Sequence, residues 1–185
     1  MTIPVDNPRK WDITDPYLYE LQVCLWRDML RENGSAETIG NSASQRTEQL
    51  TAQGTNSREL CQEEHLRIGF RTMQFDPVRG FLLNGRKVRL NGACDHHDLG
   101  ALGAAFHKEA MRRKFELMRS MGVNAVRTSH NMPAVELMEL ADEMGFLIVS
   151  EAFDMWEMAK NPYDYARFFK EWMEKDVRSW IRRDR

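Results

Sequence analysis

The stretch from Asn124 to Trp156 constrains the fold of this 185-residue chain most, because it predicts a strand, a helix and a second strand in succession. A short β-branched run at 124–127 leads into four polar residues, after which Pro133 suits the first turn of a helix. Apolar residues then recur at helical spacing up to Gly145, a residue type that commonly ends helices. The continuous apolar run at 146–149 predicts a parallel strand that is covered on both faces.

Polar side chains follow the ends of three predicted strands. Asp95–Asp98 follows a predicted strand at 88–94, Thr128–Asn131 follows the next strand, and Glu151–Trp156 follows the third. Because the carboxyl ends of parallel strands meet at one edge of a sheet, we expect these clusters to converge. Imidazole, carboxylate and amide groups bind hydroxyls, and an indole offers a flat apolar face, so the mixture suits a polyhydroxylated ligand.

Two further helices complete an alternation of strands and helices from about residue 88 onward. The first is predicted at His107–Met121, with Met111, Phe115 and Met118 on one face. The second is a long amphipathic helix at 163–185. Its predicted buried stripe consists of Tyr165, Phe168, Phe169, Trp172, Val177, Trp180 and Ile181. The sequence therefore predicts three β/α units.

The residues before this alternation are rich in strand signals. Residues 17–26 alternate between apolar and polar side chains, as in a half-buried strand, and strand character returns at 59–75. Between them, residues 27–58 are dominated by small polar residues and predict a flexible insertion. Asn84-Gly85 lies between two apolar runs and predicts a hairpin.

Composition excludes several classes of protein. With 42% hydrophobic and 29% charged residues and a formal net charge of −2, the chain is not expected to bind nucleic acid or an anionic membrane. No run of about 18 apolar residues predicts a transmembrane helix, and the first residues show no signal peptide. The sequence therefore does not indicate a cellular compartment. Cys24, Cys61 and Cys94 lack the spacing of a zinc site.

The candidate histidines also have structural interpretations. His96 and His97 are adjacent, so on an extended chain they point to opposite faces and at most one of them faces a site. Either could cap the loop instead. His130 could merely satisfy backbone groups between the strand end and Pro133.

The third cluster has similar alternatives. Glu151 directly follows a buried strand, so a functional carboxylate and a buried ion-pair partner both fit it. Asp154 could cap the following loop, and a lone Trp156 would more often belong to a core than to a ligand platform. The convergence of three such clusters therefore carries more weight than any single residue.

Three linked runs resemble glycoside hydrolase family 2, and its β-galactosidase branch most. They are GFLLNGRKVRLNGACDHHDLGALGAA at Gly80–Ala105, VRTSHN at Val126–Asn131 and GFLIVSEAFDMW at Gly145–Trp156. The final IRRDR at Ile181–Arg185 resembles the start of the family's segment that leads into the fourth barrel strand. Upstream, NPRKWDITDPYLYELQV and RIGFRTMQFD resemble the last strands of the immunoglobulin-like sandwich before the barrel.

The resemblance implies a retaining mechanism on a (β/α)₈ barrel, with one glutamate as acid/base and another as nucleophile. Such a pair lies about 5–5.5 Å apart across the glycosidic bond. In the family these glutamates follow strands four and seven, so both are expected beyond Arg185. No catalytic residue is therefore assigned within this chain, which is expected to be inactive alone.

The resemblance also implies substrate-binding roles for six residues, which are His96, His130, Asn131, Glu151, Asp154 and Trp156. The chain departs from the family at Ser150, where aspartate is usual, and at Met132, where proline is usual. The additional glutamate and histidine that bind metal in some β-galactosidases are not clearly present. The prediction is therefore that the chain binds no metal and needs no cofactor.

The resulting fold prediction is an α/β chain made of a partial (β/α)₈ TIM barrel, its first three β/α units, preceded by a few antiparallel strands. Residues 1–75 are assigned to the C-terminal part of an immunoglobulin-like sandwich, and residues 76–185 to the N-terminal part of the barrel. The remainder of the barrel or a homo-oligomer is expected to be needed for stability, because three strands leave an open edge.

The predicted function is hydrolysis of O-glycosidic bonds in a carbohydrate substrate, of the β-galactosidase type. The first alternative is a non-catalytic carbohydrate-binding or interaction protein derived from such a hydrolase. The second is a metal-dependent barrel hydrolase that uses His96 or His97 with His130 and Glu151 as zinc ligands, although adjacent histidines suit one metal poorly.

Overall fold

The computed structural model describes residues 3–28 and 58–184, which form two compact units. One unit is the segment Tyr19–Ile68, and the other combines the residues up to Leu18 with those from Gly69 onward. The boundary predicted from the sequence, after residue 75, falls inside the second of these units. The assignment of residues 1–75 and 76–185 to two domains stays a prediction. None of the helices in the described ranges is long and apolar enough to cross a membrane.

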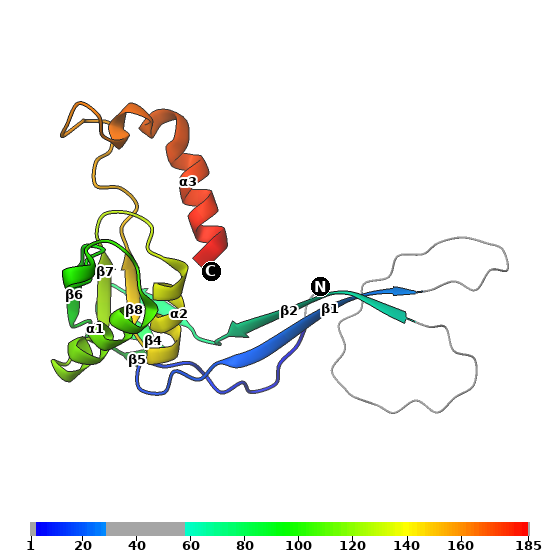
Figure 1. The fold of residues 1–185 in the computed structure, drawn as a ribbon. Helices are drawn as coiled ribbons and strands as arrows, with labels where there is room; N and C mark the ends of the chain where they lie inside the picture. The colour runs from blue at the N-terminus through cyan, green and yellow to red at the C-terminus, as the bar shows by residue number, and fades with distance from the viewer. Residues whose placement is uncertain (1–2, 29–57, 185) are drawn as a thin grey trace, which may run out of the picture. The chain divides into compact units, whose positions relative to one another are not determined.

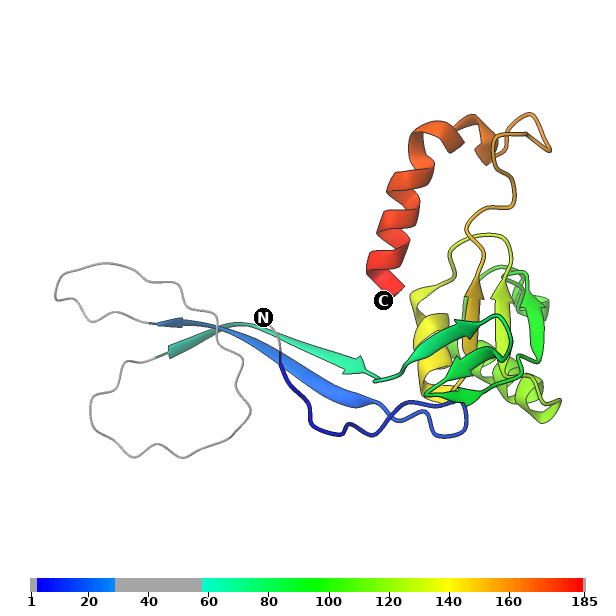
Figure 2. The same cartoon turned by 180° about the vertical axis from the view of Figure 1, so that it is seen from behind.

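The first unit is an antiparallel ribbon of two strands, β1 (Tyr19–Asp28) and β2 (Arg58–Ile68), which run side by side (Figure 2). The strand predicted at 17–26 is confirmed as β1, but its predicted half-burial is wrong, because most side chains on both strands are exposed. Within the described residues of this unit no second layer covers the ribbon. The predicted insertion at 27–58 is also too wide, since both of its ends lie in strands; its interior, 29–57, lies outside the described residues.

A small antiparallel sheet follows, made of β3 (Met73–Asp76), β4 (Gly80–Leu83) and β5 (Arg86–Lys87). The predicted hairpin at Asn84-Gly85 is confirmed, and both residues have the positive φ that a type I′ turn requires. The predicted strand character at 59–75 divides into β2 and β3. Val88 does not begin the next strand as predicted, because its N–H bonds to the carbonyl of Phe81.

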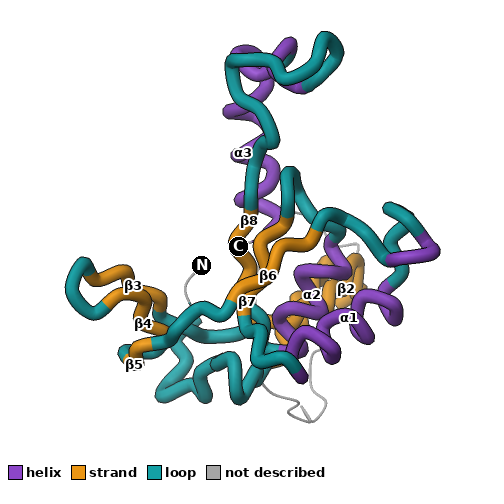
Figure 3. The backbone as a smooth tube through the Cα atoms, turned by 90° about the vertical axis from the view of Figure 1, so that its left-hand side faces the viewer, coloured by secondary structure: helices purple, strands orange, loops and turns teal. Residues whose placement is uncertain are grey.

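The predicted parallel sheet is confirmed, in the strand order β6 (Gly92–Asp95), β7 (Ala125–Thr128) and β8 (Leu147–Ser150) (Figure 1). Helix α1 (Lys108–Ser120) connects β6 to β7, and α2 (Val135–Met144) connects β7 to β8. Both helices lie on the same side of the sheet (Figure 3). A short 3₁₀ turn, η1 (Gly100–Leu102), interrupts the loop before α1.

The two faces of the parallel sheet are covered differently. The helix side is the main core, where Phe115 of α1 stacks on Phe146 with ring centroids 4.5 Å apart, as the predicted apolar face of that helix requires. On the opposite side, Trp11 and Leu83 pack against Ala125 and Leu147 at the start of β7 and β8. The far ends of the strands are left open on that side.

Two predictions of burial are wrong, one for β8 and one for the C-terminal helix. Strand β8 is not covered on both faces, since Val149 is 48% exposed. The predicted helix at 163–185 is divided into a 3₁₀ turn, η2 (Tyr165–Arg167), and α3 (Phe169–Asp184), and only Phe169 and Trp180 of α3 are buried. Of the rest of the predicted stripe, Tyr165 and Val177 are partly covered, whereas Phe168, Trp172 and Ile181 are exposed.

Candidate functional site

The three strand ends converge as predicted. In the parallel register Asp95 lies opposite Thr128, and Thr128 lies opposite Ser150, so the segments that follow all leave the same edge of the sheet. This edge is the open end described above. The clusters at 95–98, 128–131 and 151–156 therefore share one rim.

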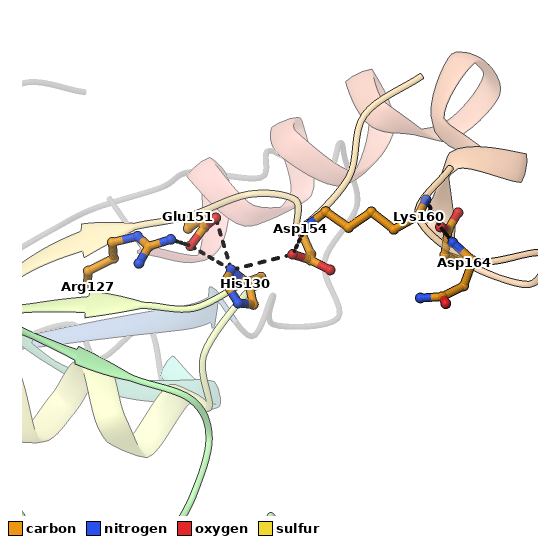
Figure 4. A network of polar contacts seen from close by, with 7 residues as sticks. Arg127, His130, Glu151, Asp154, Lys160 and Asp164 are labelled. Atoms are coloured by element: carbon orange, nitrogen blue, oxygen red, sulfur yellow. Dashed lines mark hydrogen bonds and ion pairs between the residues drawn. The ribbon is translucent and has the colours of Figure 1, made fainter. Parts of the chain in front are cut away.

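His130 and Glu151 form the centre of the rim (Figure 4). Both carboxylate oxygens of Glu151 lie 3.1 Å from Nδ1 of His130. Glu151 Oε2 also lies 2.6 Å from Nη2 of Arg127, whose Nη1 donates a hydrogen bond to Sγ of Cys94 at 3.2 Å. The bond to Cys94 and the charge of Glu151 raise the pKa of Arg127 above its ordinary value. These residues come from three neighbouring strands and tie them together at the rim.

Asp154 extends this network along the loop after β8. Its Oδ1 lies 2.5 Å from Nζ of Lys160 and 3.7 Å from Nδ1 of His130. The Lys160 ammonium holds the pKa of the Asp154 carboxyl below its usual range, with a smaller contribution from His130. Asp164 in turn accepts backbone hydrogen bonds from Lys160 at 2.7 Å and Asn161 at 2.8 Å (Figure 4). The loop is thus held to the rim by charge pairs and backbone caps.

His96 and His97 separate, as their adjacency predicted. The ring of His96 meets the ring of His130 edge to face, with centroids 5.1 Å apart, so His96 belongs to the rim. His97 has a φ of 55° and lines a cavity of about 130 Å³ under the β6–α1 loop. Its Nε2 atom is buried and has no hydrogen-bond partner within the described part of the chain. The cavity lies on the helix side, among Leu99, Phe106, Met111 and Leu137.

The carboxylates of the first cluster are bound to a helix. Lys114 of α1 pairs with Asp95, which is 2% exposed, and with Asp98 at 3.2 Å. Burial alone would lower the pKa of Lys114, but its bonds to the two carboxylates outweigh that effect and raise it. The Lys114 bond likewise lowers the pKa of Asp98. Asp95 and Asp98 therefore anchor the loop that carries His96.

The two remaining candidates are accessible. Asn131 is exposed, and no hydrogen bond of its side chain is present among the described residues. Trp156 is 67% exposed and stacks on Phe169 with centroids 5.9 Å apart, so it is neither a core residue nor an isolated one. Phe169 also meets Phe153, which stacks on Tyr165 at 5.0 Å. This aromatic cluster supports the open face of Trp156.

Sequence reasoning missed Arg127 and Lys160. A signal for Arg127 existed, because it is the one charged residue in the short predicted strand at 124–127, and a charge within a sheet needs a partner. Lys160 carried no signal, since the irregular loop that brings it to Asp154 has no periodicity. No group of three or more metal-binding side chains is present in the two described ranges.

Residues 78–174 match the profile of the TIM barrel domain of glycosyl hydrolases family 2. The chain belongs to this family. Among its curated family relatives, a β-galactosidase of Bacteroides ovatus is 40% identical over 184 residues, which are 99% of this chain and 18% of that protein. A putative β-glucuronidase of Formosa agariphila is 39% identical over 131 residues, or 70% of this chain and 13% of that protein.

Solved structures of glycoside hydrolases agree with this assignment. A β-glycosidase from Bacteroides vulgatus aligns over 96% of this chain with a TM-score of 0.74 and 34% identity. A family member from Bacteroides cellulosilyticus aligns over 96% with a TM-score of 0.73 and 35% identity. Each alignment covers 19% of the solved chain, so this chain spans less than a fifth of the length of these two relatives.

Proposed function

We propose that this chain is part of a longer retaining glycoside hydrolase that removes terminal β-linked sugars, and that its substrate is a β-galactoside. The 40% identity to the Bacteroides ovatus β-galactosidase extends along 99% of the chain and supports this substrate. In this proposal β6, β7 and β8 are the first three strands of the barrel. Residues 1–75 are the end of an immunoglobulin-like sandwich, and residues 76–185 begin the barrel domain.

The rim formed by the three strand ends is the observation that carries the proposal. His96, His130 and Asn131 bind sugar hydroxyls, because imidazole and amide groups both donate and accept hydrogen bonds. Glu151 and Asp154 shape the pocket around them. The exposed indole of Trp156 offers a flat apolar surface to a sugar ring.

The catalytic acid/base and nucleophile come from parts of the barrel that these 185 residues do not include. A retaining pair needs carboxyl groups about 5–5.5 Å apart on either side of the scissile bond. The same missing strands, or a second copy of the chain, cover the open ends of β8 and α3. This requirement is supported by the exposure of Val149, Trp172 and Ile181.

Replacing His130 with alanine tests the sugar-binding role of the rim. In the complete protein that carries this sequence, H130A should lower kcat/KM for nitrophenyl β-galactoside by about tenfold to a hundredfold, since one to two hydrogen bonds to the substrate are lost. Its melting temperature should change little, because His130 is partly exposed.

The matched control is H65A, which removes an exposed histidine of the β1–β2 ribbon. H65A should retain the kinetics of the unaltered protein. Unchanged kinetics of H130A on every aryl glycoside would refute the role of His130. Saturable sugar binding without hydrolysis by the complete protein would favour a carbohydrate-binding function instead.

A further inference from the structure

Nδ1 of His130 is surrounded by acceptors. Glu151 presents both of its oxygens at 3.1 Å, and Oδ1 of Asp154 lies 3.7 Å away (Figure 4). A carboxylate accepts hydrogen bonds and cannot donate them. The proton of a neutral His130 ring is therefore favoured on Nδ1, where Glu151 accepts it.

Glu151 is itself held in place from its other side. Arg127 reaches Oε2 at 2.6 Å, and Arg127 is fixed by its bond to Cys94 on the neighbouring strand. A guanidinium is always charged, so Arg127 attracts the Glu151 carboxylate and fixes its orientation. Asp154 does not substitute for Glu151, because it lies beyond hydrogen-bond distance from Nδ1 and is bound by Lys160.

The other ring nitrogen of His130 has a different environment. Nε2 makes no hydrogen bond among the described residues. It is not one of the buried polar atoms that lack a partner there, so it is accessible. A neutral imidazole with its proton on Nδ1 presents a lone pair at Nε2. The ring of His96 packs against the same imidazole, with the two ring planes at 79° to each other.

We propose that Glu151 is a positioning residue that fixes the Nδ1–H tautomer of His130, so that Nε2 accepts a hydrogen bond from a hydroxyl of the sugar. Arg127 acts indirectly, because it holds the Glu151 carboxylate in place beside His130. The inference rests on the proposed function and specifies it further. It makes His130 a hydrogen-bond acceptor, and it gives Glu151 no contact of its own with the substrate.

A double-mutant cycle in the complete protein separates this role from a direct one. E151Q keeps the shape of the side chain but adds a donor that permits the other tautomer. We expect E151Q to raise KM for nitrophenyl β-galactoside about tenfold with a smaller change in kcat, as loss of one oriented hydrogen bond would do. H130Q places an amide near the position of Nε2 and should retain more activity than H130N, whose amide lies near Nδ1.

The decisive comparison is E151Q in the H130Q background. If Glu151 acts only through His130, E151Q should have little further effect there, so the two changes are strongly non-additive. E157Q is the matched control, because Glu157 is an exposed carboxylate of the same loop that pairs with Lys170 at 3.7 Å and lies outside the His130 network.

The outcomes distinguish this inference from the proposed function. Full additivity of E151Q and H130Q, or a KM of E151Q equal to that of the unaltered protein, overturns the positioning role and leaves the glycosidase proposal intact. Absence of glycosidase activity in the unaltered complete protein overturns the proposed function and the inference with it.

Discussion

Single residues decide how closely the segments of this chain approach each other. Gly145 ends α2 with a φ of 70°, and a Cβ at this position would lie 2.6 Å from the carbonyl oxygen of Ile13. Gly122 ends the turn after α1 with a φ of 82°, and a Cβ at this position would meet no atom of the described residues within 4 Å. The two glycines therefore share a backbone conformation and differ only in the space around them.

Alanine at these two positions separates backbone strain from a steric clash. Gly122→Ala should lower the free energy of unfolding by about 1–2 kcal/mol, the cost of a left-handed conformation. Gly145→Ala should lower it by about 1–3 kcal/mol more, because the methyl group must displace the backbone at Ile13. Parallel urea titrations of the two variants measure the difference. Equal losses would show that the approach to Ile13 is not tight.

The sequence predicted the turns and cores at this scale better than the site. Gly145 and Asn84-Gly85 were found because the backbone conformation of a helix end or a tight hairpin selects the residue type directly. The partnership of Arg127 with Glu151 was not found, since it depends on which strands are neighbours. The six predicted binding residues remain a prediction; His96, His130, Glu151 and Asp154 do lie together.

Elements are joined by a few polar links in addition to the apolar core. Lys114 connects α1 to the end of β6 through Asp95 and Asp98. Arg183 near the end of α3 donates to the carbonyl of Pro133 at 2.8 Å. In the aromatic cluster, burial and a hydrogen bond to Asp176 raise the pKa of Tyr165 to about 12, so this link stays protonated at neutral pH.

Removing Lys114 should loosen the first β/α unit. Lys114→Met leaves the buried Asp95 carboxylate without its cation, and loss of one partner of a buried pair costs about 3–5 kcal/mol. The measurement is the free energy of unfolding in urea. The double variant D95N/K114M is the control and should recover much of the loss, because no uncompensated charge remains.

The stability that the Lys114–Asp95 pair contributes changes with pH in a definite direction. Because the folded-state pKa of Lys114 is raised, its contribution to stability is fully present below the ordinary lysine pKa and is lost as pH rises through the folded value. The stability gap between the unaltered protein and K114M should therefore persist at neutral pH and close only at alkaline pH. A K114M variant within 0.5 kcal/mol of the unaltered protein (roughly the spread of neutral surface changes) would contradict this account.

Element predictions failed where they concerned burial and not secondary structure. The apolar pattern of β8 and α3 correctly indicated strand and helix, but Val149, Trp172 and Ile181 are exposed. Periodicity reports which face is apolar and does not report what covers that face. The β1–β2 ribbon failed in the same way, since its alternation implied a second layer that the described residues do not supply.

At the scale of the whole molecule, the chain is a family 2 member that covers 18% of its Bacteroides ovatus relative. Its parallel strands and the polar rim at their ends are formed within the chain, whereas the proposed acid/base and nucleophile are not. The rim thus provides one wall of a proposed sugar site. This division of roles is the central claim, and it makes hydrolysis a property of the complete protein.

The most direct test is the anomeric configuration of the first sugar released from nitrophenyl β-galactoside, followed by proton NMR. The complete protein that carries this sequence should release the β-anomer first, as a retaining mechanism requires. The 185-residue chain alone should release none. First release of the α-anomer, or robust release by the 185-residue chain alone, would contradict the account.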